Sequence, residues 1–284
     1  MSSQDVRRVL AAHLPECRVE SVERLGEGWE NIAYEVNGEV IVRFTKSPDT
    51  TVVEREGRLL ATVAEIVSLA VPAPLFVSAA DGCMAYRKVP GVPLLDLPIE
   101  ARAPHAAAVG AELGRMLAEL HAIPVERMAG LVGQDADPLT RWHSDAVEEY
   151  ATVGGLVPER HRAAVEHYLT APVPDERFDL VFSHNDLGIE HVLVDPVSWA
   201  VTGVIDWSDA AIVDPAYDFG LILRDLGPVA LDAALGTVDD RFRERAVFYA
   251  RASVFNDLTY GVDMGEDAYV EKCVAAMEWL FPAR

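Results

Sequence analysis

Hydrophobic and polar positions alternate in short runs over the first ninety residues, and later apolar residues recur every three or four positions. The first pattern is typical of strands and the second of helices. Strands are predicted at 19–25, 32–36, 40–44, 75–78 and 84–89, and helices at 6–14 and 51–66. The pair Asn37-Gly38 between two apolar runs indicates a hairpin. This region is therefore predicted to be a small, mainly antiparallel sheet with one packed helix.

The rest of the chain is predicted to be mainly helical. Helical spacing covers 106–121, 159–169, 241–260 and 268–281, and strand character is confined to 181–182, 191–195 and 201–207. The Pro/Gly-rich segment "VPGVPLLDLP" separates the two patterns and is the best candidate boundary. We therefore expect an α+β chain of two lobes, 1–90 and 91–284, the second carrying a short hairpin.

The formal net charge of −22 narrows the possible partners. An acidic surface repels phosphate backbones and anionic lipids, so neither nucleic acid nor a membrane is expected as a partner. It would favour a cationic small molecule, but the simpler interpretation of the charge is solubility. No apolar run approaches the roughly 20 residues that span a bilayer, and residues 1–20 lack an apolar signal core. Three widely spaced cysteines, Cys17, Cys83 and Cys273, indicate reduced thiols. A cytoplasmic protein is expected, as a monomer or weak homodimer.

The segment "FSHNDLGIEHVLVD" places a polar group between two apolar strands. Strands 191–195 and 201–206 are joined by a short turn, and antiparallel pairing predicts that Asp195 faces Thr202 and His191 faces Asp206. Asp186 lies on the loop before this hairpin. One loop and one hairpin would therefore bring an Asp, a His and a second Asp together.

This group of side chains suits phosphoryl transfer. That reaction needs a carboxylate to position the acceptor hydroxyl and take its proton, and a divalent cation held by one or two protein ligands. Asp186 suits the first role and Asp206 the second. The alternative is that these residues only form caps and turns at the end of a hairpin.

Two motifs carry a family resemblance. "SHNDLGIEHVLVD" followed by "VTGVIDWSDAAIVDPAYDFG" resembles the signature of the aminoglycoside phosphotransferase family, antibiotic kinases with a protein-kinase-like fold. The resemblance implies that Asp186 is catalytic, that Asp206 binds the metal and that His184 braces the catalytic loop. It assigns structural roles to Asp214 and Asp218.

His191 departs from most of this family, which has Asn at that position. Imidazole suits transition metals better than Mg²⁺, which alone would suggest a pseudokinase. Macrolide phosphotransferases are similar to this chain at the same position, with His in the pattern His-x-Asp-x-x-x-x-His. We therefore expect His191 and Asp206 to hold Mg²⁺.

The resemblance also implies a nucleotide site. "LGEGWEN" is similar to the family's shortened phosphate loop, with Gly26 and Gly28, and Arg43 occupies the position of the strand cation that aligns the phosphates. Glu56 would hold Arg43, whereas Glu54 points away on the same helix. The expected nucleotide-binding set is completed by Met84, Arg87, Val89 and Ile205. The purine contacts are made by main-chain groups, so the choice between ATP and GTP as co-substrate stays open.

The acceptor site is expected on the later helices, rich in acids for a cationic antibiotic-like molecule. The candidates are Asp209, Asp257, Tyr260, Asp263 and Glu266. The same residues could equally form a solvated surface. Two other functions stay open: a metabolic kinase acting on choline, homoserine or a sugar, and a non-catalytic nucleotide-binding scaffold. A protein kinase is disfavoured because the Arg-Asp pair of its catalytic loop is missing.

Overall fold

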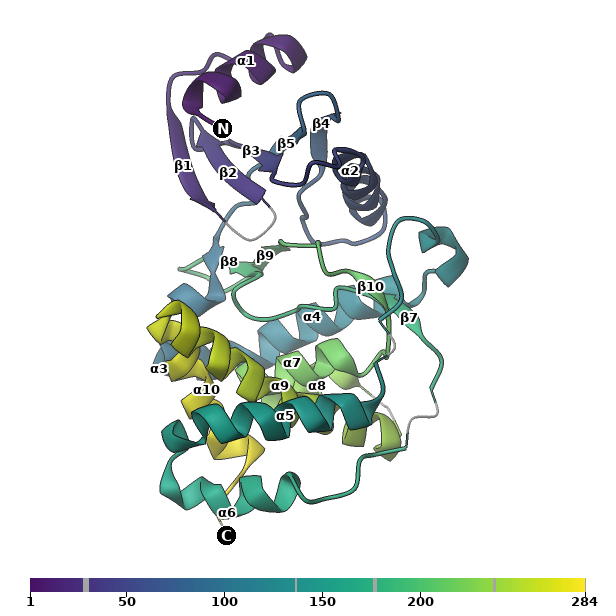
Figure 1. The fold of residues 1–284 in the computed structure, drawn as a ribbon, viewed down its shortest axis with the longest axis vertical. Helices are drawn as coiled ribbons and strands as arrows, with labels where there is room; N and C mark the ends of the chain where they lie inside the picture. Colours follow the sequence, from purple (N-terminus) through teal and green to yellow (C-terminus); the bar gives the residue numbers. More distant parts are fainter. Residues whose placement is uncertain (28–30, 136, 176–177, 237–238, 284) are drawn as a thin grey trace.

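The computed structural model describes residues 1–27, 31–135, 137–175, 178–236 and 239–283. A smaller lobe built on a sheet sits above a larger helical lobe, with the chain passing between them near residue 90 (Figure 1). This arrangement confirms the expected α+β, two-lobed fold. Within the described ranges, none of the helices has the length and apolar character needed to cross a bilayer.

The small lobe is a five-stranded antiparallel sheet in the order β1-β2-β3-β5-β4. Its strands are β1 (Val22–Glu27), β2 (Asn31–Val36), β3 (Val40–Thr45), β4 (Pro74–Ser78) and β5 (Cys83–Arg87). Alternation along β3 sends Val42 and Phe44 into the core beneath α1 (Ser3–His13). Arg43 points to the opposite face, where it meets α2 (Thr51–Ala64).

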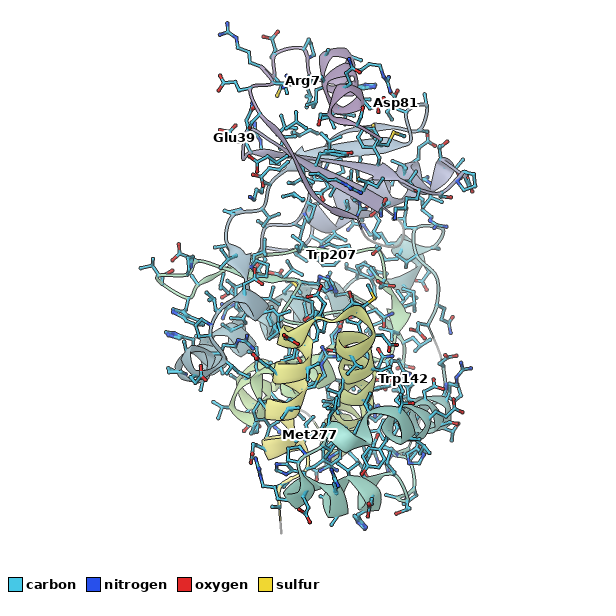
Figure 2. All side chains as sticks on the ribbon, turned by 60° about the vertical axis from the view of Figure 1, so that its left-hand side comes forward. Arg7, Glu39, Asp81, Trp142, Trp207 and Met277 are labelled. Atoms are coloured by element: carbon cyan, nitrogen blue, oxygen red, sulfur yellow. The ribbon has the colours of Figure 1, made fainter. Side chains whose placement is uncertain are left out.

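The large lobe is built from helices that pack in pairs. They are α3 (Ile99–Arg102), α4 (Ala106–His121), α5 (Leu139–Val153), α6 (Glu159–Tyr168), α7 (Tyr217–Leu226), α8 (Pro228–Leu235), α9 (Asp240–Met264) and α10 (Asp267–Leu280). The short 3-10 turns are η1 (Leu94–Asp96), η2 (Ala103–His105), η3 (Val125–Met128) and η4 (Gly154–Leu156). Helix α4 packs on α8, and α9 packs on α5, α7 and α10. Trp207, which is buried, lies where the two lobes meet (Figure 2).

Two small sheets form the upper surface of the large lobe. One has the order β6-β8-β9, from β6 (Val92–Pro93), β8 (Val192–Val194) and β9 (Val201–Val204), and the other pairs β7 (Val181–Ser183) with β10 (Ala211–Val213). Because β6 lies in the connector, the chain between the lobes is hydrogen-bonded to the predicted catalytic hairpin. Ala70 also contacts β9, where its carbonyl accepts a hydrogen bond from Val204 N at 3.0 Å.

The expected register of the hairpin is wrong, by one residue at its open end and by two next to the turn. Val192 pairs with Val204, and His191 O accepts a hydrogen bond from Ile205 N, so His191 lies opposite Ile205 and not Asp206. Asp195 N donates to Ala200 O, so Asp195 does not face Thr202. A bulge between Leu193 and Val194 shifts the pairing, and such an insertion leaves no mark in hydrophobic alternation.

Candidate active site

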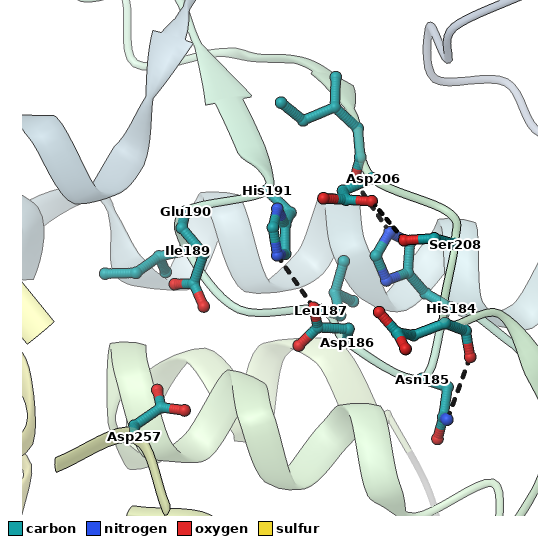
Figure 3. A network of polar contacts seen from close by, with 12 residues as sticks. His184, Asn185, Asp186, Leu187, Ile189, Glu190, His191, Asp206, Ser208 and Asp257 are labelled. Atoms are coloured by element: carbon teal, nitrogen blue, oxygen red, sulfur yellow. Dashed lines mark hydrogen bonds and ion pairs between the residues drawn. The ribbon is translucent and has the colours of Figure 1, made fainter. Parts of the chain in front are cut away.

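The catalytic loop runs from β7 to β8 and is held by buried polar contacts (Figure 3). His184 is fully buried, its Nε2 lies 3.1 Å from Ile205 O, and its ring packs edge-on against Trp207 at 4.6 Å between centroids. Asn185 adopts the left-handed conformation with φ of 63°, which turns the chain sharply before Asp186. His184 therefore braces the loop, as the resemblance implied.

Two acids on one face of α7 accept hydrogen bonds from the loop backbone. Asp218 accepts from Asn185 N at 2.9 Å and from Leu187 N at 3.2 Å. Asp225, two helical turns later, accepts from Ile189 N at 3.2 Å. The loop therefore rests on a helix whose position is fixed by the core, a geometry suited to precise placement of Asp186.

Asp214 has the structural role that was expected of it. Its carboxylate accepts hydrogen bonds from Arg245 Nε at 2.8 Å and from the Tyr249 hydroxyl at 3.2 Å, and it caps the turn through Ala216 N at 2.9 Å. Being buried and fully engaged, it holds the start of α7 against α9.

Asp186 is paired with His191. Asp186 Oδ2 lies 3.0 Å from His191 Nε2. Burial alone would lower the pKa of His191, but the hydrogen bond and charge of Asp186 outweigh it and raise that pKa to about 9. Burial alone would raise the pKa of Asp186, and the hydrogen bond and charge of His191 instead bring it below its usual range. The structure therefore holds a carboxylate oriented by an imidazolium at neutral pH.

Asp206 lies beside this pair (Figure 3). It has a φ of 60°, a left-handed conformation that turns the chain out of β9 and directs the carboxylate toward His191. Burial would raise the pKa of Asp206, but the charge of His191, a hydrogen bond from Ser208 and the charge of Arg43 lower it. Asp206 therefore faces His191 despite the error in register, but the ligand atoms that lie within 4.8 Å of one another are those of Asp186, Glu190 and His191.

An interlobe cavity of about 660 Å³ lies beside the catalytic loop region, and of the expected nucleotide-binding residues that the structure describes, Glu56 is the one in its lining. It is lined from the small lobe by the end of β3 and by α2, including Lys46, Arg55 and Glu56, and from the large lobe by Leu131, Val132, Gly133, Ser208 and Ala210. Glu56 forms an ion pair with Arg43, which confirms the expected partner. Gly28 lies outside the described residues, and Gly26 is at the exposed end of β1.

The other expected nucleotide residues differ in burial. Met84 and Val89 are buried, Ile205 is partly buried and Arg87 is exposed. Tyr86, which was not predicted, is close enough to Arg43 and Asp206 for both charges to affect its pKa, although burial is the main reason that this pKa is raised. Tyr86 lies within a predicted strand, and hydrophobic alternation along that strand did not show that its side chain lies between the lobes.

The expected acceptor residues do not gather at one point. Asp257 is held in ion pairs, with its Oδ2 at 2.8 Å from Lys272 Nζ and 3.0 Å from an Arg224 nitrogen. Tyr260, Asp263 and Glu266 are exposed on the last turns of α9 and just beyond it. Asp209 is exposed next to the catalytic loop, where its carbonyl accepts a hydrogen bond from Asn185 at 3.1 Å.

A second cavity, of about 250 Å³, adjoins the catalytic loop on the side of α5 and was missed in the sequence. Acidic and aromatic side chains line it, among them Asp135, Asp137, Trp142 and Tyr217. Asp135 accepts a hydrogen bond from Asn185 Nδ2 at 3.2 Å, which connects the cavity to the residue before Asp186. The sequence feature that could have indicated this cavity is the pair of acids in "GQDADPLTRW". This segment has no hydrophobic periodicity that would have placed the acids on a helix or a strand.

The donor set suits a divalent cation through its carboxylates. Asp186 and Asp206 offer the oxygen ligands that Mg²⁺ prefers. His191 Nε2 is engaged with Asp186, and as an imidazolium it has no lone pair to offer. Asp186, Glu190 and His191 each have one ligand atom within 4.8 Å of the others. The residues therefore fit Mg²⁺ mainly through oxygen.

Comparison with known proteins identifies the family. The model of the phosphotransferase enzyme family matches residues 21–251. The chain belongs to this family. The catalytic loop, the hairpin and the acids of α7 all lie within the matched region, whereas Asp257, Tyr260, Asp263 and Glu266 lie beyond it.

Individual relatives are similar at modest identity. Viomycin phosphotransferase of Streptomyces vinaceus is 28% identical over 184 residues, which are 61% of this chain and 63% of that relative's length. The GDP complex of aminoglycoside 2'-phosphotransferase-IIIa is 26% identical with a TM-score of 0.70, covering 98% of both chains. Macrolide 2'-phosphotransferase MphH from Brachybacterium faecium is 22% identical with a TM-score of 0.64, covering 96% of this chain and 97% of that one, and shares the fold.

Proposed function

We propose that the protein transfers the γ-phosphoryl group of ATP or GTP to a hydroxyl of a small cationic antibiotic-like molecule, of the macrolide or aminoglycoside type, and so inactivates it. The observation that carries this proposal is the Asp186 carboxylate, oriented by His191 beside Asp206. Relatives solved with GDP, and viomycin phosphotransferase as a relative, support the nucleotide and the class of acceptor.

In the proposed reaction Asp186 orients the acceptor hydroxyl and receives its proton. The hydroxyl oxygen forms a bond to the γ-phosphorus while the bond from that phosphorus to the bridging oxygen breaks, and the nucleoside diphosphate leaves with that electron pair. Arg43, fixed by Glu56, aligns the phosphates from the small lobe. Each of these groups is held by a contact with a second element.

Asp206 would hold Mg²⁺, and His191 could join it only as a neutral imidazole, with one ring nitrogen deprotonated. When bound, the ion neutralises the negative charge on the phosphate oxygens. Binding of the acceptor is supported by the acidic and aromatic cavity beside Asn185, because ammonium groups are attracted by carboxylates and by aromatic faces.

The test compares wild type with Asp186→Asn on macrolides, aminoglycosides and cationic peptide antibiotics, with ATP and GTP. We expect Asp186→Asn to lower kcat by about 10²- to 10⁴-fold and to abolish resistance in a susceptible host. Asp195→Asn is the matched control, because Asp195 only caps the turn of the hairpin through Val197 and Ser198.

The same assay includes choline, homoserine and simple sugars. Turnover of these metabolites without turnover of any antibiotic would replace the proposed acceptor with a metabolic one. Nucleotide binding without turnover of any acceptor, unaffected by Asp186→Asn, would instead indicate a non-catalytic scaffold.

A further inference from the structure

Lys272 of α10 lies at the centre of a buried group of charges outside the predicted site. Its side chain is 2% exposed. Its Nζ lies 2.8 Å from Glu190 Oε2, 2.8 Å from Asp257 Oδ2 and 3.3 Å from Asp225 Oδ2. These carboxylates come from the catalytic loop, α9 and α7, so one ammonium group joins three elements to α10.

Lys272 is one of two cations in this cluster, which also contains three carboxylates. Arg224 pairs with Asp225 at 2.8 Å and with Asp257 at 3.0 Å, so its positive charge is shared by the two acids on helices. The described ion pairs give Glu190 no cation other than Lys272. Removing Lys272 would leave three buried carboxylates facing one guanidinium, and the charge of Glu190 would be the least compensated.

The cluster reaches the catalytic loop at two points. Asp225 accepts a hydrogen bond from Ile189 N, and Glu190 is the next residue of the loop. Glu190 also has a carboxylate oxygen within 4.8 Å of the ligand atoms of Asp186 and His191. An uncompensated Glu190 would therefore compete with Asp186 for His191 and attract a divalent cation to the wrong place.

We propose that Lys272 is a positioning residue for phosphoryl transfer: it draws Glu190 toward α10 and leaves His191 to orient Asp186. The role rests on the proposed function, since it acts on the geometry of Asp186. Lys272 is not expected to contact either substrate, because it is buried behind Glu190.

The first experiment compares Lys272→Met with Met277→Ala, a core substitution on the same helix that leaves the charges intact. Both variants are expected to lower the Tm. Only Lys272→Met is expected to lower kcat by about tenfold to a hundredfold with little change in the KM of the acceptor. It should also bind Mn²⁺ about tenfold more tightly in the absence of nucleotide, measured by calorimetry, because Glu190 is freed. Equal kcat and equal Mn²⁺ affinity in the two variants would overturn the proposal.

The second experiment adds Glu190→Gln to Lys272→Met. If Lys272 acts through the charge of Glu190, the double variant recovers part of the lost kcat and returns to the wild-type Mn²⁺ affinity. The separate variant Lys272→Arg, which keeps the positive charge, should retain part of the kcat that Lys272→Met loses. A double variant no better than Lys272→Met would overturn the proposal, because a loss of kcat that does not come from the charge of Glu190 is not restored by neutralising it.

A further comparison does not depend on the folding of Lys272→Met. Glu190→Gln alone leaves Lys272 with two carboxylates, so its Mn²⁺ affinity should stay near that of wild type. A loss of about tenfold would make Glu190 a metal ligand and overturn the proposal. Mn²⁺ binding is measured without an acceptor, so these results stand even if no antibiotic proves to be a substrate.

Discussion

Glu56 lines the interlobe cavity and is paired with Arg43, whereas Glu54 is exposed on the same helix. We expect Glu56→Gln to raise the KM for the nucleotide by about tenfold, because Arg43 loses the partner that fixes it. Steady-state kinetics with varied nucleotide measure this effect, and Glu54→Gln is the matched control. The same KM in both variants would contradict a role for the ion pair.

Short sequence motifs predicted which side chains lie near one another when those side chains come from the same loop and hairpin. Asp186, Asp206 and His184 lie together because one loop and one hairpin carry them all. Asp257 shows where prediction from the sequence fails. Its partners Arg224 and Lys272 lie on other helices, and no spacing along the chain reveals that a charge will be buried in ion pairs.

Asp81 connects elements of the small lobe. It lies in the turn between β4 and β5 and pairs with Arg8 at 2.7 Å and His13 at 3.2 Å, both on α1. Hydrogen bonds from Arg8, Ser78 and His13 lower the pKa of Asp81 from 3.8 to about 2.

Because this folded-state pKa is lower than the unfolded one, Asp81 stabilises the lobe fully above about pH 4 and loses that effect as the pH falls toward 2. Thermal unfolding of wild type and Asp81→Asn should show a gap in Tm at pH 7 that narrows over this range. A gap that does not vary with pH would show that the ionised form is not responsible.

Helices α4 and α8 approach closely at two glycines. A Cβ built on Gly114 would lie 2.3 Å from Ala234 O, and one on Gly110 would lie 2.3 Å from Ala230 O. We expect Gly114→Ala to lower the free energy of unfolding by about 1–3 kcal/mol, because backbone atoms cannot move aside as a flexible side chain can.

Denaturant unfolding of the purified variants measures this change. Gly155→Ala is the control, since a Cβ there meets nothing within 4 Å. If Gly114→Ala were as stable as Gly155→Ala, the close packing of α4 on α8 would be wrong.

Helix α4, which has one apolar face, was predicted from the sequence, whereas α7, which is buried on all sides, was not, and neither was α5. The spacing in α4 predicted its bounds of Ala106–His121, because polar residues mark its outer face. In α7 all ten residues are buried, and its polar side chains Asp218, Arg224 and Asp225 face the catalytic loop and buried ion pairs instead of solvent. The strand expected over 201–207 ends at Val204, where the chain turns toward Asp206.

The net charge of −22 affects the whole molecule. It should attract a cationic acceptor over distances longer than a contact, and salt screens this attraction. We expect the KM for a cationic acceptor to rise severalfold between about 0.01 M and 0.15 M KCl, where the Debye length falls from about 30 to 8 Å. A neutral hydroxyl acceptor is the control, and an equal response of both would exclude electrostatic attraction.

The division into a sheet lobe and a helical lobe followed from the change of hydrophobic period alone. How the lobes meet did not, because it depends on contacts between distant segments. One is the bridge between Ala70 and Gly203, and another is the hydrogen bond from Ser68 N to the Glu119 carboxylate. These contacts determine how the lobes are placed, and therefore also the interlobe cavity, which residues of both lobes line.

A Cβ on Gly203 would lie 2.4 Å from Ala70 O and 2.4 Å from Cγ1 of Val89, one of the expected nucleotide-binding residues. Any replacement would push the small lobe away from β9 and change the width of the cavity. A saturation library scored by survival on an antibiotic would therefore rank this buried glycine with the essential positions, although it never meets the drug.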